Sequence, residues 1–94
     1  MPAYSVAVMN VSNPEKYQEY AKLAGPAVAK YGGRFLFRAG NPAVMEGRFD
    51  YSRMVVVEFP DADSAKKYYH SPEYQAAMAK RLGAADFNLV VLEG

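Results

Sequence analysis

The stretch that decides the fold is Arg53-Met54-Val55-Val56-Val57-Glu58-Phe59, followed by Pro60 and Asp61. β-Branched residues fill its centre, which predicts a strand over residues 53–59, and the proline ends that strand because it cannot continue the ladder. Asp61 is a favourable N-cap, so a helix is expected from there to about Tyr69. Ser71-Pro72 repeats the cap-then-proline signal and predicts a second helical segment to about Leu82, with a break at His70-Ser71.

The residues on the N-terminal side follow the same pattern. Residues 4–11 predict a strand with apolar side chains on both faces. Asn13-Pro14-Glu15 then combines a cap, a first-turn proline and an acidic residue at the positive end of the helix dipole, which predicts a helix start. Gly32-Gly33 predicts its end, and Pro26 is expected to kink this helix without ending it.

Two further strands complete the order, at Arg34–Arg38 and Phe87–Leu92, and residues 44–46 are compatible with a short additional strand. The order strand, helix, strand, strand, helix, strand is the split β-α-β arrangement. It predicts one α+β domain over residues 1–94, with a four-stranded antiparallel sheet and helices on one face only.

Composition excludes several classes of function. The chain has 94 residues, a net charge of +1, no cysteine and one histidine. This balance offers no electrostatic basis for binding nucleic acid or an anionic membrane, and no disulfide or thiolate chemistry. No metal site and no cofactor are expected, because the chain offers a single imidazole and no thiolate as metal ligands and has no cofactor-binding motif. No apolar run is long enough to span a bilayer, and the N-terminus lacks the features of a signal peptide, so the expected location is cytoplasmic.

The helix-free face of the sheet separates two further interpretations. An RNA-recognition domain has the same topology, but the positions expected to stack bases are Ala7, Met54 and Val56, none of which is an aromatic ring. With Met9, these residues are instead expected to form an apolar patch that is covered by the same face of a second copy. The sequence therefore predicts a homodimer through the open face; the alternative is a monomer whose helices cover this face.

Five segments along nearly the whole chain resemble one protein family. They are Asn13-Pro14-Glu15-Lys16-Tyr17, Tyr31-Gly32-Gly33-Arg34-Phe35-Leu36, Glu46-Gly47, Val57-Glu58-Phe59-Pro60 and Tyr69-His70-Ser71-Pro72-Glu73-Tyr74. Their order and spacing are similar to those of the bacterial family called domain of unknown function 1330. The resemblance implies a ferredoxin-like fold that dimerises as an α/β barrel, and no established activity. Related barrel families include small monooxygenases, haem-degrading enzymes and lactone isomerases, and the fold does not choose among them.

The resemblance also marks candidate site residues, at positions where the family has polar or aromatic side chains: Arg38, Glu46, Arg53, Tyr69, Ser71, Tyr74 and Arg81. Arg38 ends one strand and Arg53 begins the next, so a hairpin brings both to the same edge of the sheet. Two guanidinium groups with tyrosine hydroxyls could hold a carboxylate or an enolate. The alternative is that Arg38 and Arg53 form structural ion pairs with Glu46 and Glu58.

His70 is the single imidazole and a weak candidate for general acid–base catalysis, since a solvent-facing residue between two helices explains it equally well. Ser71 is explained by capping. Whether the protein is an enzyme stays open. The sequence favours a protein that binds or transforms a small anionic or oxygenated molecule; the alternatives are a non-catalytic interaction or regulatory module and a cofactor-dependent oxidoreductase.

Overall fold

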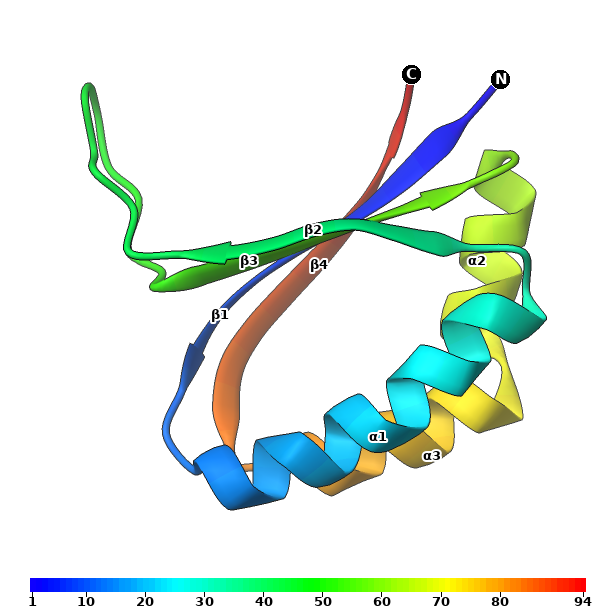
Figure 1. Cartoon of the computed structure of the whole chain (residues 1–94), viewed down its shortest axis with the longest axis horizontal. Coiled ribbons are helices and arrows are strands. Elements are labelled where there is room, and N and C mark those ends of the chain that lie inside the picture. Colours follow the sequence, from blue (N-terminus) through cyan, green and yellow to red (C-terminus); the bar gives the residue numbers. More distant parts are fainter.

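The computed structural model describes residues 1–94 and contains a four-stranded sheet with three helices packed on one of its faces (Figure 1). The elements are β1 (Ala3–Val11), α1 (Pro14–Lys30), β2 (Arg34–Gly40), β3 (Arg53–Phe59), α2 (Ala62–His70), α3 (Pro72–Arg81) and β4 (Ala85–Glu93). The strand order is β2-β3-β1-β4, and all neighbours are antiparallel. This confirms the predicted ferredoxin-like order. Within one chain the sheet is open and does not close into a barrel.

The three helix starts are set by the side chains expected to cap them. Asn13, Asp61 and Ser71 each accept a hydrogen bond from the backbone amide three residues on, at 3.2, 2.7 and 3.0 Å respectively. Each bond satisfies a donor that the first turn of a helix leaves without an intrahelical partner. The break between α2 and α3 lies at Ser71, as predicted, and α1 continues through Pro26.

Two glycines end helix α1 and connect it to β2. Gly32 has a φ of +81°, and its amide donates to Ala29, while the amide of Gly33 donates to Val28. This is the Schellman arrangement, in which the residue after the cap adopts the left-handed conformation that glycine reaches without steric cost. It turns the chain sharply enough for β2 to return along the sheet.

The register of β1 corrects the predicted composition of the open face. Val6 lies opposite Val56, and Ala7 lies opposite Val55 on the helix-covered side. The placement of Ala7 and Met9 on the open face was therefore wrong: both are buried beneath the helices. Alternation along a strand separates two faces but does not say which one the helices cover. The apolar residues of the open face include Tyr4, Val6, Val8, Phe37, Ala39, Met54, Val56, Val90 and Leu92.

A β-bulge in strand β2 changes which side chains face the helices. The register shifts between Phe35 and Phe37, and Leu36 is the extra residue. Phe35 faces the helices, Phe37 lies on the open face, and Arg38, opposite Val55, faces the helices again. Without the bulge, alternation from Phe35 would place Arg38 on the open face.

Residues 41–52 form a projecting arm between β2 and β3 (Figure 1). The short strand expected at residues 44–46 does not form, and Met45 is 91% exposed. The base of the arm is held to β1, because the side chain of Asn10 donates to the carbonyl of Asp50 and accepts from the amide of Ser52. No helix in the structure combines the length and the apolar character needed to cross a membrane.

Candidate functional site

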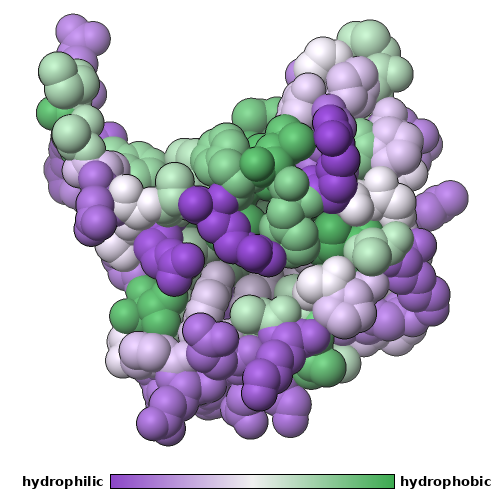
Figure 2. All heavy atoms as spheres, in the orientation of Figure 1, coloured by the Kyte–Doolittle hydropathy of each residue, from purple (hydrophilic) through white to green (hydrophobic).

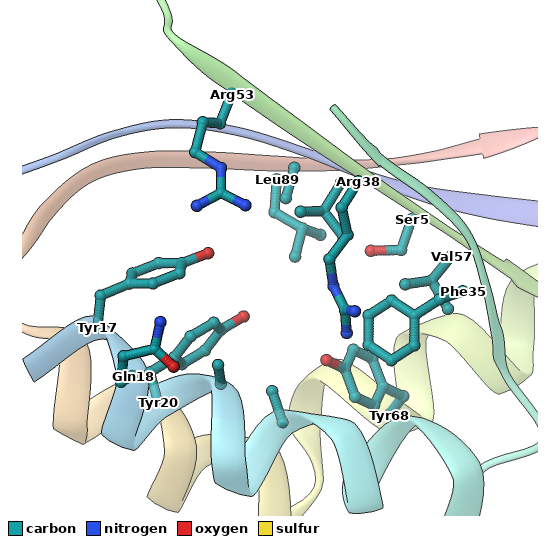
Figure 3. Close-up of a pocket in the computed structure, with 14 residues that line it drawn as sticks. Ser5, Tyr17, Gln18, Tyr20, Phe35, Arg38, Arg53, Val57, Tyr68 and Leu89 are labelled. Carbon is teal, nitrogen blue, oxygen red and sulfur yellow. The ribbon is translucent and has the colours of Figure 1, made fainter. Parts of the chain in front are cut away.

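A cavity of about 290 Å³ lies between helix α1 and the covered face of the sheet (Figure 3). Strands β1, β2, β3 and β4 supply one side of it, and helices α1 and α2 supply the other. Its polar lining residues are Ser5, Tyr17, Gln18, Tyr20, Arg38, Arg53 and Tyr68, and its apolar ones are Ala7, Ala21, Ala24, Phe35, Val55, Val57 and Leu89. The volume is close to the lower end of the usual range for small-molecule sites.

The cavity exists because small side chains face each other across the interface between the sheet and α1. Ser5 and Ala7 are successive inward residues of the central strand β1, and Ala21 and Ala24 lie opposite them on α1. Larger side chains at these positions would fill the space to the density of an ordinary core. The sequence carries this signal as a row of small residues on one face of a strand.

The two arginines point into this cavity from the sheet (Figure 3). Arg38 on β2 lies opposite Val55 on β3, and Arg53 is two residues before Val55 on β3. The side chains of Arg38 and Arg53 therefore occupy diagonal positions on the same face of the sheet. Neither forms an ion pair: the ion pairs of the chain are Lys30–Glu73, Arg48–Asp50 and, on the open face at 2.8 Å, Arg34–Glu58. The alternative of structural pairs with Glu46 and Glu58 is therefore wrong. Arg38 instead stacks over the ring of Phe35, 4.1 Å from its centroid.

Three tyrosines line the cavity from the helices, and the sequence did not single them out as site residues. Tyr17 and Tyr20 lie three residues apart on the face of α1 that packs against the sheet, and Tyr68 lies on α2, so their pattern in the sequence is that of ordinary core residues. Burial raises the pKa of each of these phenols above its ordinary value. For Tyr17, the positive charge of Arg53 opposes the rise in pKa. All three phenols therefore remain protonated at neutral pH and can act as hydrogen-bond donors.

No carboxylate and no imidazole line the cavity. Its charged groups are two cations, and its hydroxyl groups stay protonated, so it offers donors and positive charge to a ligand. The lining contains no group that would accept a proton from a ligand near neutral pH. The arrangement is suited to holding an oxygen that already carries negative charge. Nowhere in the structure do three or more histidine, aspartate or glutamate side chains gather in the way a metal ion requires.

Tyr74 and Arg81 lie behind the cavity and do not line it. Tyr74 is fully buried, and its hydroxyl is 3.0 Å from the hydroxyl of Tyr20. Arg81 donates to the Tyr74 hydroxyl at 3.4 Å, and its guanidinium carbon lies 3.7 Å from the ring centroid of Phe87. The hydrogen bonds of these two candidate residues therefore lead to the cavity through Tyr20, and the ring of Tyr74 also packs against the cavity residue Tyr68, with centroids 4.7 Å apart.

The remaining candidates lie elsewhere. Tyr69 and His70 contact each other edge to face, with ring centroids 5.2 Å apart, beside a shallow groove over β4. The hydroxyl of Ser71 caps α3 and donates to the carbonyl of Tyr68 at 2.6 Å. Glu46 is exposed on the arm. The structure thus brings Arg38 and Arg53 to the cavity, places Tyr74 and Arg81 behind it, and separates the others from it.

Glu73 joins the end of α1 to the start of α3, which supports the helix layer over the cavity. Its carboxylate accepts hydrogen bonds from the ammonium of Lys30 and from the hydroxyl of Tyr31, the latter at 2.9 Å. The Lys30 ammonium, above all, lowers the pKa of Glu73 to about 2 from an ordinary value of 4.5. Because the folded state prefers the ionised form, this contribution to stability is present above pH 4.5 and is lost as pH falls towards 2.

We expect Glu73→Gln to lower the melting temperature at pH 7, because the amide cannot replace the carboxylate. The difference between wild type and variant should shrink as pH falls from 4.5 towards 2, since the wild-type carboxylate is then neutralised. Thermal unfolding followed by circular dichroism across this range measures it. Glu19→Gln, at an exposed glutamate of α1 outside all ion pairs, should show no such pH-dependent difference. A constant difference between wild type and Glu73→Gln would contradict this role.

Solved structures with the same fold cover almost the entire chain. A protein of unknown function from Rhodopseudomonas palustris is 20% identical with a TM-score of 0.80, over 99% of this chain and 82% of its own. A dimeric ferredoxin-like protein of unknown function from Jannaschia sp. CCS1 is 13% identical with a TM-score of 0.75, over 100% of both chains. SnoaB, a cofactor-independent oxygenase from Streptomyces nogalater, is 12% identical with a TM-score of 0.70, over 99% of this chain and 92% of its own.

At these identities the structures establish a shared fold and no shared activity. No curated protein matches the sequence. The sequence profile of one family, described as a domain of unknown function (DUF1330), matches residues 2–94. With its ferredoxin-like fold and nearly complete coverage, this chain belongs to the DUF1330 family.

Proposed function

We propose that this protein is a homodimer that binds a small anionic or oxygenated molecule in the cavity beneath helix α1. One observation supports ligand binding: Arg38 and Arg53 both point into a cavity whose lining contains no carboxylate, and neither arginine forms an ion pair. Such a cavity attracts anions and disfavours cations. Its lining is apolar between the charged groups, which suits a ligand with a hydrocarbon body.

The size of the cavity limits the ligand to about one ring or two fused rings. A dry apolar cavity of roughly 150 Å³ is enough to bind benzene. The cavity here, at about 290 Å³, is nearly twice that volume. A substituted benzene ring with one acidic group is therefore a suitable probe, and benzoate is the simplest example.

The dimer part is supported by the open face of the sheet. In Figure 2, apolar side chains gather along the upper side of the molecule, above the sheet and between the projecting arm and the chain ends. On this face Phe37, Val90 and Leu92 are each about half exposed, and Val44 and Met45 on the arm are exposed as well. Burying such a patch against an identical one stabilises both copies by roughly 25 cal/mol per Å² of apolar surface. The Jannaschia relative with this fold is dimeric.

Binding of benzoate by isothermal titration calorimetry tests the ligand part. We expect Arg38→Gln and Arg53→Gln each to weaken binding about fivefold to tenfold, because each removes one charge-assisted hydrogen bond at a partly exposed rim. Benzamide, which has the same shape without the charge, should bind weakly to all of these proteins.

Arg34→Gln is the matched control, since this arginine is on the same strand but on the open face, paired with Glu58. It should bind benzoate as the wild type does. If the double variant Arg38→Gln/Arg53→Gln bound benzoate as tightly as the wild type, or if the wild type bound no aromatic anion, the proposal would be wrong. The second outcome would favour a non-catalytic interaction module.

A further inference from the structure

The hydroxyls of Tyr20 and Tyr74 and the guanidinium of Arg81 form a chain of hydrogen bonds that leads from helix α3 to the cavity. Arg81 lies 3.4 Å from the oxygen of Tyr74, and that oxygen lies 3.0 Å from the oxygen of Tyr20. No other hydrogen bond involves either hydroxyl group. The direction of this chain follows from the chemistry of its three members.

The first link has one possible direction, because a guanidinium group only donates hydrogen bonds. Arg81 therefore donates and the oxygen of Tyr74 accepts. Tyr74 is fully buried, and the single acceptor within reach of its own hydrogen is the oxygen of Tyr20. Buried hydroxyl hydrogens are nearly always used in hydrogen bonds, so Tyr74 donates to Tyr20.

The hydrogen of Tyr20 then has no acceptor within the protein. Arg81 cannot accept it, and Tyr74 has already used its hydrogen towards this oxygen. Tyr20 lines the cavity, where Figure 3 shows its hydroxyl facing the same space as Arg38 and Arg53. The free hydrogen is therefore available to a ligand, and each donor further back in the chain strengthens it as a donor.

Arg81 is held in place for this role by aromatic rings and not by a carboxylate. Its guanidinium carbon lies 3.7 Å from the ring centroid of Phe87 and 5.2 Å from that of Tyr20, and its buried Nε has no hydrogen-bond partner. A carboxylate partner would neutralise much of its field. Without one, its positive charge continues to polarise the hydroxyl chain.

Resting on the proposed function, we infer that Tyr20 donates a hydrogen bond to a ligand oxyanion at the inner end of the cavity, with Arg81 and Tyr74 as positioning residues. The exposed Arg38 and Arg53 bind a second polar group at the rim. The ligand class that matches this arrangement is a phenol, or an enolisable carbonyl compound, bound as its phenolate or enolate. The site then stabilises the anion relative to the neutral form, because all the groups facing it are donors or cations.

The titratable and charged groups that face Tyr20 come from every element packed around it. They are Tyr17 on α1, Tyr68 on α2, Tyr74 and Arg81 on α3, and Arg38 and Arg53 across the cavity. None is a carboxylate or an imidazole. A pH-dependent change in the bound ligand near neutrality therefore reports the ligand's own ionisation.

Para-nitrophenol is a suitable probe, because its neutral and ionised forms absorb at different wavelengths. We expect the wild type to lower the pKa of the bound phenol. Tyr20→Phe should reverse most of this shift and weaken phenolate binding about tenfold, as expected for the loss of one hydrogen bond to a charged group. Tyr74→Phe and Arg81→Met should each weaken it about threefold, since they remove polarisation and leave the donor. Nitrobenzene, which lacks the hydroxyl, should bind equally to all variants.

The decisive measurement is the double variant Tyr20→Phe/Tyr74→Phe. If Tyr74 acts through Tyr20, adding Tyr74→Phe to Tyr20→Phe should cause no further loss of phenolate binding. Additive losses in the double variant would overturn the inference, and so would an unchanged pKa of the bound phenol in Tyr20→Phe. The proposed function would still stand in that case if Arg38→Gln and Arg53→Gln weaken benzoate binding. Absence of binding of both benzoate and para-nitrophenolate would instead overturn the proposed function itself.

Discussion

A variant with aspartate at both Val90 and Leu92 is expected to be monomeric at micromolar concentration, where the wild type is expected to be dimeric. Each of these side chains is 53% exposed in the single chain, so the fold of the monomer should tolerate the change. They lie opposite Val6 and Tyr4 on the open face. A face-to-face dimer would bury two carboxylates from each copy against apolar surface.

The expected rise in the dissociation constant is about a thousandfold or more, equivalent to about 4 kcal/mol, because an unpaired buried charge costs several kcal/mol even after relaxation. Sedimentation velocity over a range of concentrations measures it. Leu23→Asp is the matched control: Leu23 is 41% exposed on α1, away from the open face, and this variant should remain dimeric. A monomeric wild type, or a dimeric double variant, would show that the open face does not mediate self-association.

Phe59→Ala is expected to destabilise the fold by about 3–5 kcal/mol, a large share of the stability of a domain of this size. Phe59 is buried at the end of β3, and its ring centroid lies 5.2 Å from that of Tyr68. The ring also packs against Gly33, where an added Cβ would come within 2.7 Å of it. Removing the ring leaves a cavity that the surrounding strands and helices can fill only in part.

The contact between Phe59 and Gly33 provides the test of this explanation. Gly33→Ala alone should cost about 1–3 kcal/mol, because its methyl group overlaps the Phe59 ring and a methyl of Val28. In the Phe59→Ala background, Gly33→Ala should lower the free energy of unfolding clearly less, because the contact between the added methyl group and the Phe59 ring no longer exists. Urea denaturation of the four proteins measures this coupling. Equal costs of Gly33→Ala in both backgrounds would show that packing against Phe59 is not the reason for a glycine at this position.

The helices, the strands and their order could be read from short stretches of sequence. Asn13, Asp61 and Ser71 cap their helices through bonds that span three residues, and the glycines after α1 adopt a local turn. Such signals act within one turn of chain, so neighbouring residues contain them completely. The order of these elements along the chain then predicted the split β-α-β sheet, and the resemblance to the family agreed with it.

The faces of the sheet could not be read in this way. Interpreting β1 by alternation placed Ala7 and Met9 on the open face, whereas the pairing of Val6 with Val56 places them under the helices. A shift of one residue exchanges the two faces, and both faces of this strand are apolar. The bulge at Leu36, which returns Arg38 to the helix side, leaves no sign in the residue pattern either.

The sequence by itself determined the main helices and strands, the helix caps and the pairing of two consecutive strands that brings Arg38 and Arg53 together, because each depends on neighbouring parts of the chain. Only the tertiary structure decided that these arginines share a cavity with Tyr17, Tyr20 and Tyr68, and that Arg81 lies behind it within hydrogen-bond distance of Tyr74. The physical reason is that a cavity is space left unfilled by side chains from six different elements. Its existence depends on how those elements pack, which no single stretch of sequence specifies.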